Sequence, residues 1–283
     1  MAVCLERIDQ VRRTVREARG GGRKVGLVPT MGALHEGHAS LIRVARAEAG
    51  CVVVSIFVNP TQFGPGEDLS RYPRPVEKDL DLCRREGVDV VFTPSAGEMY
   101  PEGFATSVRV ADLAEKMCGA FRPGHFDGVC TVVAKLLAII QPDVAYFGEK
   151  DAQQLAIIRR MAADLNLTPE IRGCPLVREP DGLALSSRNA YLSADERRRA
   201  LALSAALAEA KLALAAGERD AATVAGAVRQ RLEAAAGLEI QYVAVVDPDT
   251  LADLTRIADK VLVAVAAKVG QTRLIDNVLL RGL

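Results

Sequence analysis

Short apolar runs rich in valine and isoleucine alternate with segments of helical period over the first 175 residues of the chain. This alternation is typical of βαβ units, in which helices cross over a parallel sheet. Strands are predicted at 24–28, 51–58, 89–92 and 143–147. Helices are predicted at 38–49, 75–86, 127–140 and 151–165, where apolar residues recur at spacings of three and four residues. We therefore predict a doubly wound, Rossmann-like α/β domain over residues 1–176.

The pattern changes after Pro175. Ser193-Ala-Asp-Glu196 is a capping box, and it opens a helix rich in alanine and leucine that is expected to run to about Ala216. A second helix is predicted from Asp220 to near Gly237. Strand-like runs follow at 239–246, 260–267 and 273–280. We predict a smaller α+β domain over residues 177–283.

Composition excludes several classes of protein. Lys plus Arg and Asp plus Glu both number 36, so the formal net charge is zero and does not indicate a nucleic-acid partner. The six cysteines are scattered without a CxxC pair, which favours buried free thiols in a reducing compartment over zinc or disulfides. No apolar segment reaches the roughly 18 residues of a membrane span. We expect a cytoplasmic protein without membrane or nucleic-acid partners.

Two of the three histidines stand in one motif after the first predicted strand, Pro29-Thr-Met-Gly-Ala-Leu-His35-Glu-Gly37-His38. In an open α/β sheet, ligands bind outside the carboxyl ends of the strands, and a helix N-terminus there favours phosphate. The ring N–H groups of His35 and His38 are expected to bond nucleotide phosphates. Gly37 is expected to let a ligand approach the backbone.

A lone histidine is more often structural, but this HxGH placement at a strand-to-helix turn favours function. Zinc is the weaker alternative, because His35 and His38 lack a third ligand at a recognisable spacing. The chain has no GxxxxGKS or GxxxxGKT, and no GxGxxG follows a strand. These absences argue against P-loop transfer and against a dinucleotide fingerprint.

Three further polar strings are candidates for substrate contacts. Asn59 and Gln62 follow the second strand, where their amides could bond a hydroxyl or carboxylate group; an ordinary Asn-Pro turn is the alternative. The string Gly148-Glu-Lys-Asp151 follows the strand at 143–147, although such a cluster is often a solvated helix start. The Ser-Ser-Arg string at 186–188 suits a triphosphate, or else forms a plain surface loop.

These strings carry a family resemblance. HxGH in this setting resembles the nucleotidylyltransferase superfamily, and the whole string 29–38 is similar to that of pantothenate synthetases. The strings at 57–63, 67–74, 147–154, 177–189 and 273–278 agree with the narrower family in the same order. The resemblance implies ligation of (R)-pantoate to β-alanine with ATP, through a pantoyl adenylate and with release of AMP and pyrophosphate. It also implies Mg²⁺ accompanying ATP, and a homodimer.

The resemblance further implies roles for individual residues. The expected catalytic residues are His38, as principal phosphate and proton donor, His35, Lys150 and Arg188. The expected ATP contacts are Met31, Gly32, Ala33, Leu34, His35, Glu36, Gly37, His38, Gly148, Glu149, Lys150, Asp151, Val177, Leu185, Ser186, Ser187 and Arg188. Pantoate and β-alanine are expected at Asn59, Gln62, Tyr72 and Gln154, and magnesium at Asp79.

The glycine-bearing segment 64–74 is long for a connection in a compact domain, and we expect it to order over the site as a lid, with Tyr72 pointing inward. Two rival functions differ in their products. Another HxGH nucleotidylyltransferase would make a dinucleotide-like cofactor and retain the nucleotidyl group. A non-catalytic nucleotide-binding or scaffold protein would bind ATP and release no pyrophosphate.

Overall fold

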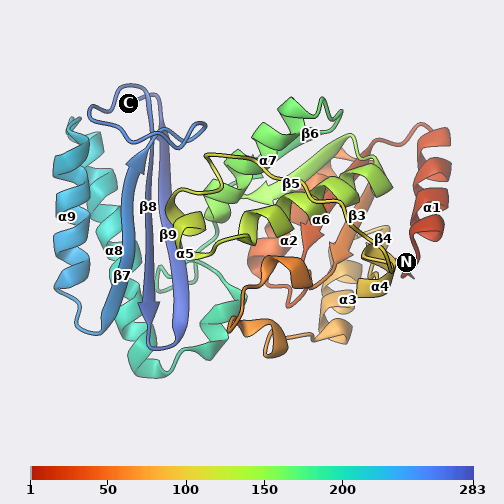
Figure 1. The fold of residues 1–283 in the computed structure, drawn as a ribbon, viewed down its shortest axis with the longest axis horizontal. Helices are drawn as coiled ribbons and strands as arrows, with labels where there is room; N and C mark the ends of the chain where they lie inside the picture. Colours follow the sequence, from red (N-terminus) through yellow and green to blue (C-terminus); the bar gives the residue numbers. More distant parts are fainter. Residues whose placement is uncertain (1) are drawn as a thin grey trace.

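The computed structural model describes residues 2–283, and its larger sheet has six parallel strands. The strand order is β1-β4-β3-β2-β5-β6 (Figure 1). The strands are β1 (Val3–Leu5), β2 (Val25–Thr30), β3 (Cys51–Ile56), β4 (Val90–Phe92), β5 (Val144–Gly148) and β6 (Glu170–Cys174). The order reverses between β2 and β5, so the loops after these two strands diverge and leave a crevice at their carboxyl ends.

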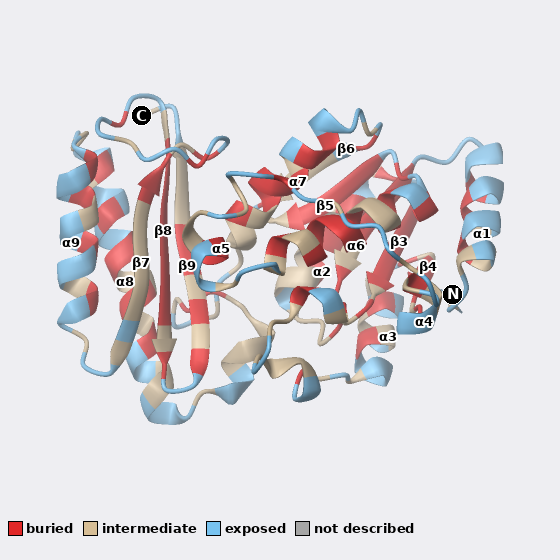
Figure 2. Cartoon of the chain, viewed as in Figure 1, coloured by how far each residue is buried: buried red, intermediate tan, exposed pale blue. Residues whose placement is uncertain are grey.

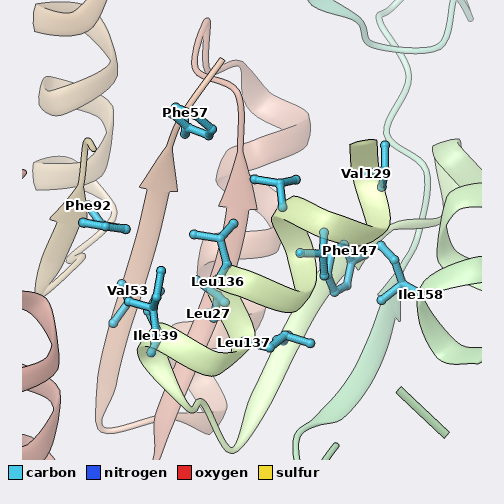
Figure 3. Packing of buried hydrophobic residues seen from close by; sticks show 14 of the residues in the cluster. Leu27, Val53, Phe57, Phe92, Val129, Leu136, Leu137, Ile139, Phe147 and Ile158 are labelled. Atoms are coloured by element: carbon cyan, nitrogen blue, oxygen red, sulfur yellow. The ribbon is translucent and has the colours of Figure 1, made fainter. Parts of the chain in front are cut away.

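Helices cover both faces of this sheet. α1 (Ile8–Gly20), α6 (His125–Ile140) and α7 (Ala152–Asp164) pack on one face, and α2 (Glu36–Glu48) and α3 (Val76–Arg85) on the other. Consecutive residues of β3 therefore enter different cores: Val53 contacts the α6 side and Val52 the α2 side, and both are buried. Figure 3 shows Leu136 and Ile139 of α6 beside Val53. Burial on both faces explains the unbroken valine run.

The smaller sheet is antiparallel, in the order β7-β8-β9, and follows two long helices. Its strands are β7 (Leu238–Val246), β8 (Lys260–Val269) and β9 (Thr272–Arg281), and α8 (Ala194–Ala215) and α9 (Ala221–Glu233) cover one face. On the other face, Leu262 and Ala264 pack against Ala156 of α7. Buried residues therefore line both faces of β8 (Figure 2), and the two sheets are joined across α7.

The predicted fold class is confirmed, and the predicted long elements are found within a few residues of their expected ends. The edge strands β1 and β6 were not predicted, because β1 has three residues and β6 contains Arg172 and Gly173 in place of an apolar run. Five cysteines are buried free thiols, whereas Cys4 is exposed. The division into two domains near residue 176 stays a prediction.

Two short helices complete the fold, α4 (Ala96–Met99) and α5 (Met117–Phe121). Across residues 2–283, every helix is too short or too polar to cross a lipid bilayer.

The first turn of α6 lies directly against the turn Pro60–Gln62 that follows β3. A Cβ on Gly128 would lie 2.4 Å from the carbonyl oxygen of Thr61 and 2.7 Å from the Cα of Gln62. The carbonyl of Gly128 also accepts a hydrogen bond of 3.1 Å from Asn59 Nδ2. Glycine permits this close approach because it has no side chain.

Gly128→Ala should lower the free energy of unfolding by about 1–3 kcal/mol, because the added methyl group pushes α6 away from the turn. Gly226→Ala in α9 is the matched control, since a Cβ there meets nothing within 4 Å and alanine favours a helix by about 1 kcal/mol over glycine. Urea unfolding of both variants measures the difference. An unchanged midpoint for Gly128→Ala would show that the contact carries no strain.

Candidate active site

A cavity of about 240 Å³ opens at the carboxyl ends of β2 and β5, where the strand order reverses. Side chains from distant parts of the sequence line it, including the loop that leads into α8. The predicted residues that it brings together are Met31, His35, Gly37, His38, Asn59, Gln62, Tyr72, Gly148, Lys150, Asp151, Gln154, Val177, Leu185, Ser186, Ser187 and Arg188. Gly32, Ala33, Leu34, Glu36 and Glu149 do not line it.

The two motif histidines are fixed by the start of α2. His35 is the N-cap residue, and its Nδ1 accepts a hydrogen bond of 3.2 Å from the amide of Gly37. His38 Nδ1 accepts a bond of 3.3 Å from the amide of His35, and the two ring centroids lie 4.2 Å apart. Because each Nδ1 is an acceptor, each ring carries its proton on Nε2. No other described residue bonds either Nε2–H, so both are available to a ligand.

Both imidazoles are neutral near pH 7. Burial, followed by the nearby ammonium of Lys150, lowers the pKa of His35 to about 4. Burial, followed by His35 and Lys150, lowers the pKa of His38 to about 3. A neutral ring with a proton on Nε2 still donates a hydrogen bond to phosphate. At neutral pH, His38 is therefore a hydrogen-bond donor and not a charged acid.

Asp79 holds the turn between β2 and α2. Its side chain is 1% exposed, and its two oxygens accept bonds of 2.9 and 2.7 Å from the amides of Ala33 and Leu34. Burial raises the pKa of this carboxyl, although the two amide bonds act in the opposite direction. Asp79 does not line the cavity. Its predicted contact with magnesium stays a prediction without support from this geometry.

Asn59 fixes the amide of Gln62. Its Nδ2 donates to the carbonyl of Gly128 and to Gln62 Oε1, both at 3.1 Å. Its Oδ1 accepts a 2.7 Å bond from the hydroxyl of Tyr100 and another from Thr61. Since Asn59 is 1% exposed and fully bonded, it orients Gln62 rather than meeting solvent. Gln62 lines the cavity, and its Nε2 donates one hydrogen bond of 3.1 Å to Met31 Sδ.

The smaller sheet supports the lysine loop. Asn277 of β9 donates two hydrogen bonds of 2.9 Å from Nδ2, to the carbonyls of Glu149 and Lys150. Lys150 Nζ lies 3.8 Å from the carboxylate of Asp151 and lines the cavity. The backbone that carries the Lys150 ammonium is therefore held in place by β9 of the C-terminal part of the chain. Asn277 lies in the string 273–278 that carries the family resemblance, but no role was predicted for it, because its partners are backbone carbonyls 127 and 128 residues away in sequence.

Segment 64–74 lies across the cleft and is bonded on two sides. Asp68 accepts two bonds of 2.9 Å from Nε and Nη2 of Arg188, and Glu67 accepts bonds of 2.7 and 2.6 Å from Arg122. The hydroxyl of Tyr72 lies 3.3 Å from Ser187 Oγ. Tyr72 points inward, as the sequence predicts. Motion of the segment as a lid stays a prediction.

Arg122 and His125 are two charged or titratable residues of the cavity that the sequence did not predict. Arg122 donates to His125 Nε2 at 2.9 Å, and His125 Nδ1 donates to the carbonyl of Gln62 at 2.8 Å. Burial and the adjacent Arg122 lower the pKa of His125 to about 4. This network fixes the main chain of Gln62. The available signal was that His125 is the third and last histidine in the sequence.

The cavity does not offer a metal site built from protein ligands. Over residues 2–283, His, Cys, Asp and Glu side chains nowhere gather in a group of three that could hold a metal ion. Asp151 is the carboxylate that lines the cavity beside Lys150. Mg²⁺ often binds through substrate phosphates and water with one or two carboxylates, and this arrangement permits that mode.

Comparison with known proteins gives one consistent result. The family model of pantoate-beta-alanine ligase matches residues 3–279. The chain is 55% identical over 277 residues to a pantothenate synthetase of a Thermoanaerobacter species, covering 98% of each chain. It is 56% identical over 276 residues to that of Moorella thermoacetica, again covering 98% of each.

Solved structures agree. Pantothenate synthetase of Thermus thermophilus superposes with a TM-score of 0.93 at 46% identity, covering 98% of this chain and 99% of that one. Pantoate-beta-alanine ligase of Francisella tularensis, complexed with beta-gamma ATP and beta-alanine, gives a TM-score of 0.78 at 34% identity, covering 99% and 98%. With a full-length family match and curated relatives above half identity, this chain belongs to the pantoate-beta-alanine ligase family.

Proposed function

We propose that this chain joins pantoate to β-alanine with ATP and forms pantothenate, AMP and pyrophosphate. The observation that carries the proposal is the cavity at the β2–β5 crevice, which is lined by two neutral imidazole donors, an ammonium and a guanidinium. Such donors suit a triphosphate whose negative charge grows as pyrophosphate leaves. Family membership supplies the identity of the substrates.

The chemistry requires activation of a carboxylate, which is a poor electrophile in water. A carboxylate oxygen of pantoate attacks the α-phosphorus, the bond from that phosphorus to the bridging oxygen breaks, and pyrophosphate leaves. The amine of β-alanine then attacks the acyl carbon of the pantoyl adenylate, AMP leaves, and the amine loses a proton. The protein forms no covalent bond to either substrate in this sequence.

The residues contribute placement and charge stabilisation. His38, His35, Lys150 and Arg188 bond the phosphates, and orientation alone can supply about 7–11 kcal/mol of the barrier reduction. The oriented amide of Gln62 donates to the carboxylate of pantoate and later to that of β-alanine. Gln154 and Tyr72 border the same substrates. Exclusion of water by segment 64–74 protects the mixed anhydride from hydrolysis.

We propose three further properties. Mg²⁺ would accompany ATP and offset the charge of its phosphates, and Asp151, which lines the cavity, would be the carboxylate available to it. The cytosol is the compartment, because six free cysteines suit a reducing environment. A homodimer follows from the family resemblance alone.

The activity is tested by supplying pantoate and ATP without β-alanine and following labelled pyrophosphate into ATP. Exchange is expected, because adenylate formation is reversible before the amine arrives. Addition of β-alanine should yield AMP and pantothenate, and omission of pantoate should abolish both readouts. A rival nucleotidylyltransferase would retain the nucleotidyl group on its product, and a scaffold protein would give no exchange with any acid.

His38→Ala should lower turnover about a hundredfold, because it removes a donor that strengthens as charge develops on the phosphates. His38→Gln keeps an N–H donor at a similar reach and should lose less. Steady-state kinetics measures turnover, and thermal unfolding of both variants shows whether they fold. A rate near that of the wild type for His38→Ala would remove this residue from the mechanism.

All three histidines should remain neutral down to about pH 5, because burial lowers each pKa from about 6.5 toward 4 or below. Below pH 6.5 the unfolded chain therefore binds more protons than the folded chain. The free energy of unfolding should fall as pH drops from 6.5 to 4. NMR titration of the imidazole signals checks the assignment, and a midpoint near 6.5 for His35 or His38 would contradict it.

A further inference from the structure

Consecutive carboxylates of segment 64–74 bind two arginines of the cavity. Glu67 binds Arg122, which precedes α6, and Asp68 binds Arg188, which follows the serine pair of the C-terminal half. Both pairs are largely shielded, with side-chain exposures of 13% and 25% for Arg122 and Glu67 and of 28% and 13% for Arg188 and Asp68. Each guanidinium already has an anionic partner.

The pair with Arg188 uses one of the two edges of the guanidinium that can hold a phosphate. Asp68 Oδ2 accepts from Nε and Oδ1 from Nη2, both at 2.9 Å, so the contact is bidentate. Two parallel N–H donors fit a carboxylate and a phosphate equally well. One fork cannot hold both anions in this geometry. A phosphate that binds Arg188 through this edge must displace the carboxylate.

Charge also opposes joint binding. Although its burial favours the neutral acid, the bonds from Arg188 lower the pKa of Asp68, so this side chain is an anion at neutral pH. Nothing but Arg188 pairs with Asp68 within 4.0 Å among the cationic side chains of residues 2–283. An arriving triphosphate would meet this carboxylate at close range in a shielded site, where repulsion between anions is strong.

We propose that Asp68 occupies the position on Arg188 that a phosphate group of ATP takes, so that ATP displaces the carboxylate and departing pyrophosphate allows it to return. Asp68 is thereby an affinity-determining residue for the nucleotide. The proposal rests on the proposed function, because it takes ATP as the ligand of Arg188. The carboxylate weakens ATP binding in the empty enzyme and, by the same exchange, favours the release of pyrophosphate after adenylate formation.

The neighbouring pair explains how the carboxylate can move without release of the whole segment. Glu67 also accepts a 3.2 Å bond from the amide of Gly64, and its bonds to Arg122 do not involve Arg188. Tyr72 is 6% exposed and packs edge-on against Phe63, with ring centroids 6.0 Å apart. These contacts anchor both sides of Asp68, so rotation of one side chain is sufficient to free Arg188.

The test is direct binding of ATP, and separately of pyrophosphate, to the full-length protein by calorimetry without pantoate. Asp68→Asn keeps the shape of the side chain and removes its charge, so both ligands should bind about tenfold tighter, as loss of a shielded competing anion predicts. Glu67→Gln is the matched control, since it loosens the same segment but leaves Asp68 on Arg188. It should leave both dissociation constants near those of the wild type.

A double-mutant cycle completes the test. Arg188→Gln should weaken ATP binding, and adding Asp68→Asn to it should tighten binding by clearly less than tenfold, because the competition requires the guanidinium and only repulsion between the anions remains. Unchanged or weaker ATP binding by Asp68→Asn would overturn the proposal and make Asp68 a residue that orients Arg188. Equal tightening by Glu67→Gln would also overturn it, since loosening of the segment would then be the cause.

Further measurements distinguish failure of this proposal from misfolding of a variant and from failure of the proposed function. Thermal unfolding is measured for each variant, and Asp68→Ser replaces Asp68→Asn if the latter does not fold. Failure of pyrophosphate exchange with intact ATP binding would reject the proposed function and leave the competition at Arg188 standing. Absence of ATP binding to the wild type would overturn both.

Discussion

The parallel pairing of β2 with both β3 and β5 is the constraint on which the rest of the structure depends. Because the crossovers from β2 and β5 pass to opposite sides, their carboxyl ends open onto one shared crevice. The HxGH motif leaves one of these strands and the Glu-Lys-Asp string leaves the other. Two polar strings more than 100 residues apart in sequence thus become neighbours. The pairing of the strands brings them together, and the strings themselves need no direct contact.

Precision within the crevice comes from buried polar side chains that bond to other residues of the site. Asp79 binds two amides of the turn before α2, and Asn59 binds Gln62 and the backbone of α6. A carboxylate or amide that is buried must be bonded, and here the bonds determine where functional neighbours point. His125 has the same effect on the main chain of Gln62. The donors that face the cavity are therefore oriented before any ligand arrives.

This division explains what the sequence could and could not predict. Residues expected to contact a ligand lie in recognisable strings, and His35, His38, Gln62, Lys150 and Arg188 from these strings all line one cavity. Residues that act through another residue leave no pattern, because their partners are distant in sequence. Asn277 and Arg122 were missed for this reason, and the bonds of Asp79 to the turn were unforeseen. The strands β1 and β6 escaped prediction because edge strands need no continuous apolar run.

Segment 64–74 contacts both the N-terminal and the C-terminal parts of the site. Glu67 contacts Arg122, whereas Asp68 and Tyr72 contact Arg188 and Ser187 in the C-terminal half. Its contacts to Arg122, Ser187 and Arg188 are ion pairs and one hydrogen bond, whereas the sheets are held by continuous apolar cores. Ion pairs can exchange one anion for another at little net cost, because the desolvated cation stays paired throughout. An enzyme that binds and releases polyanions benefits from closing its site with interactions that its own substrate can replace.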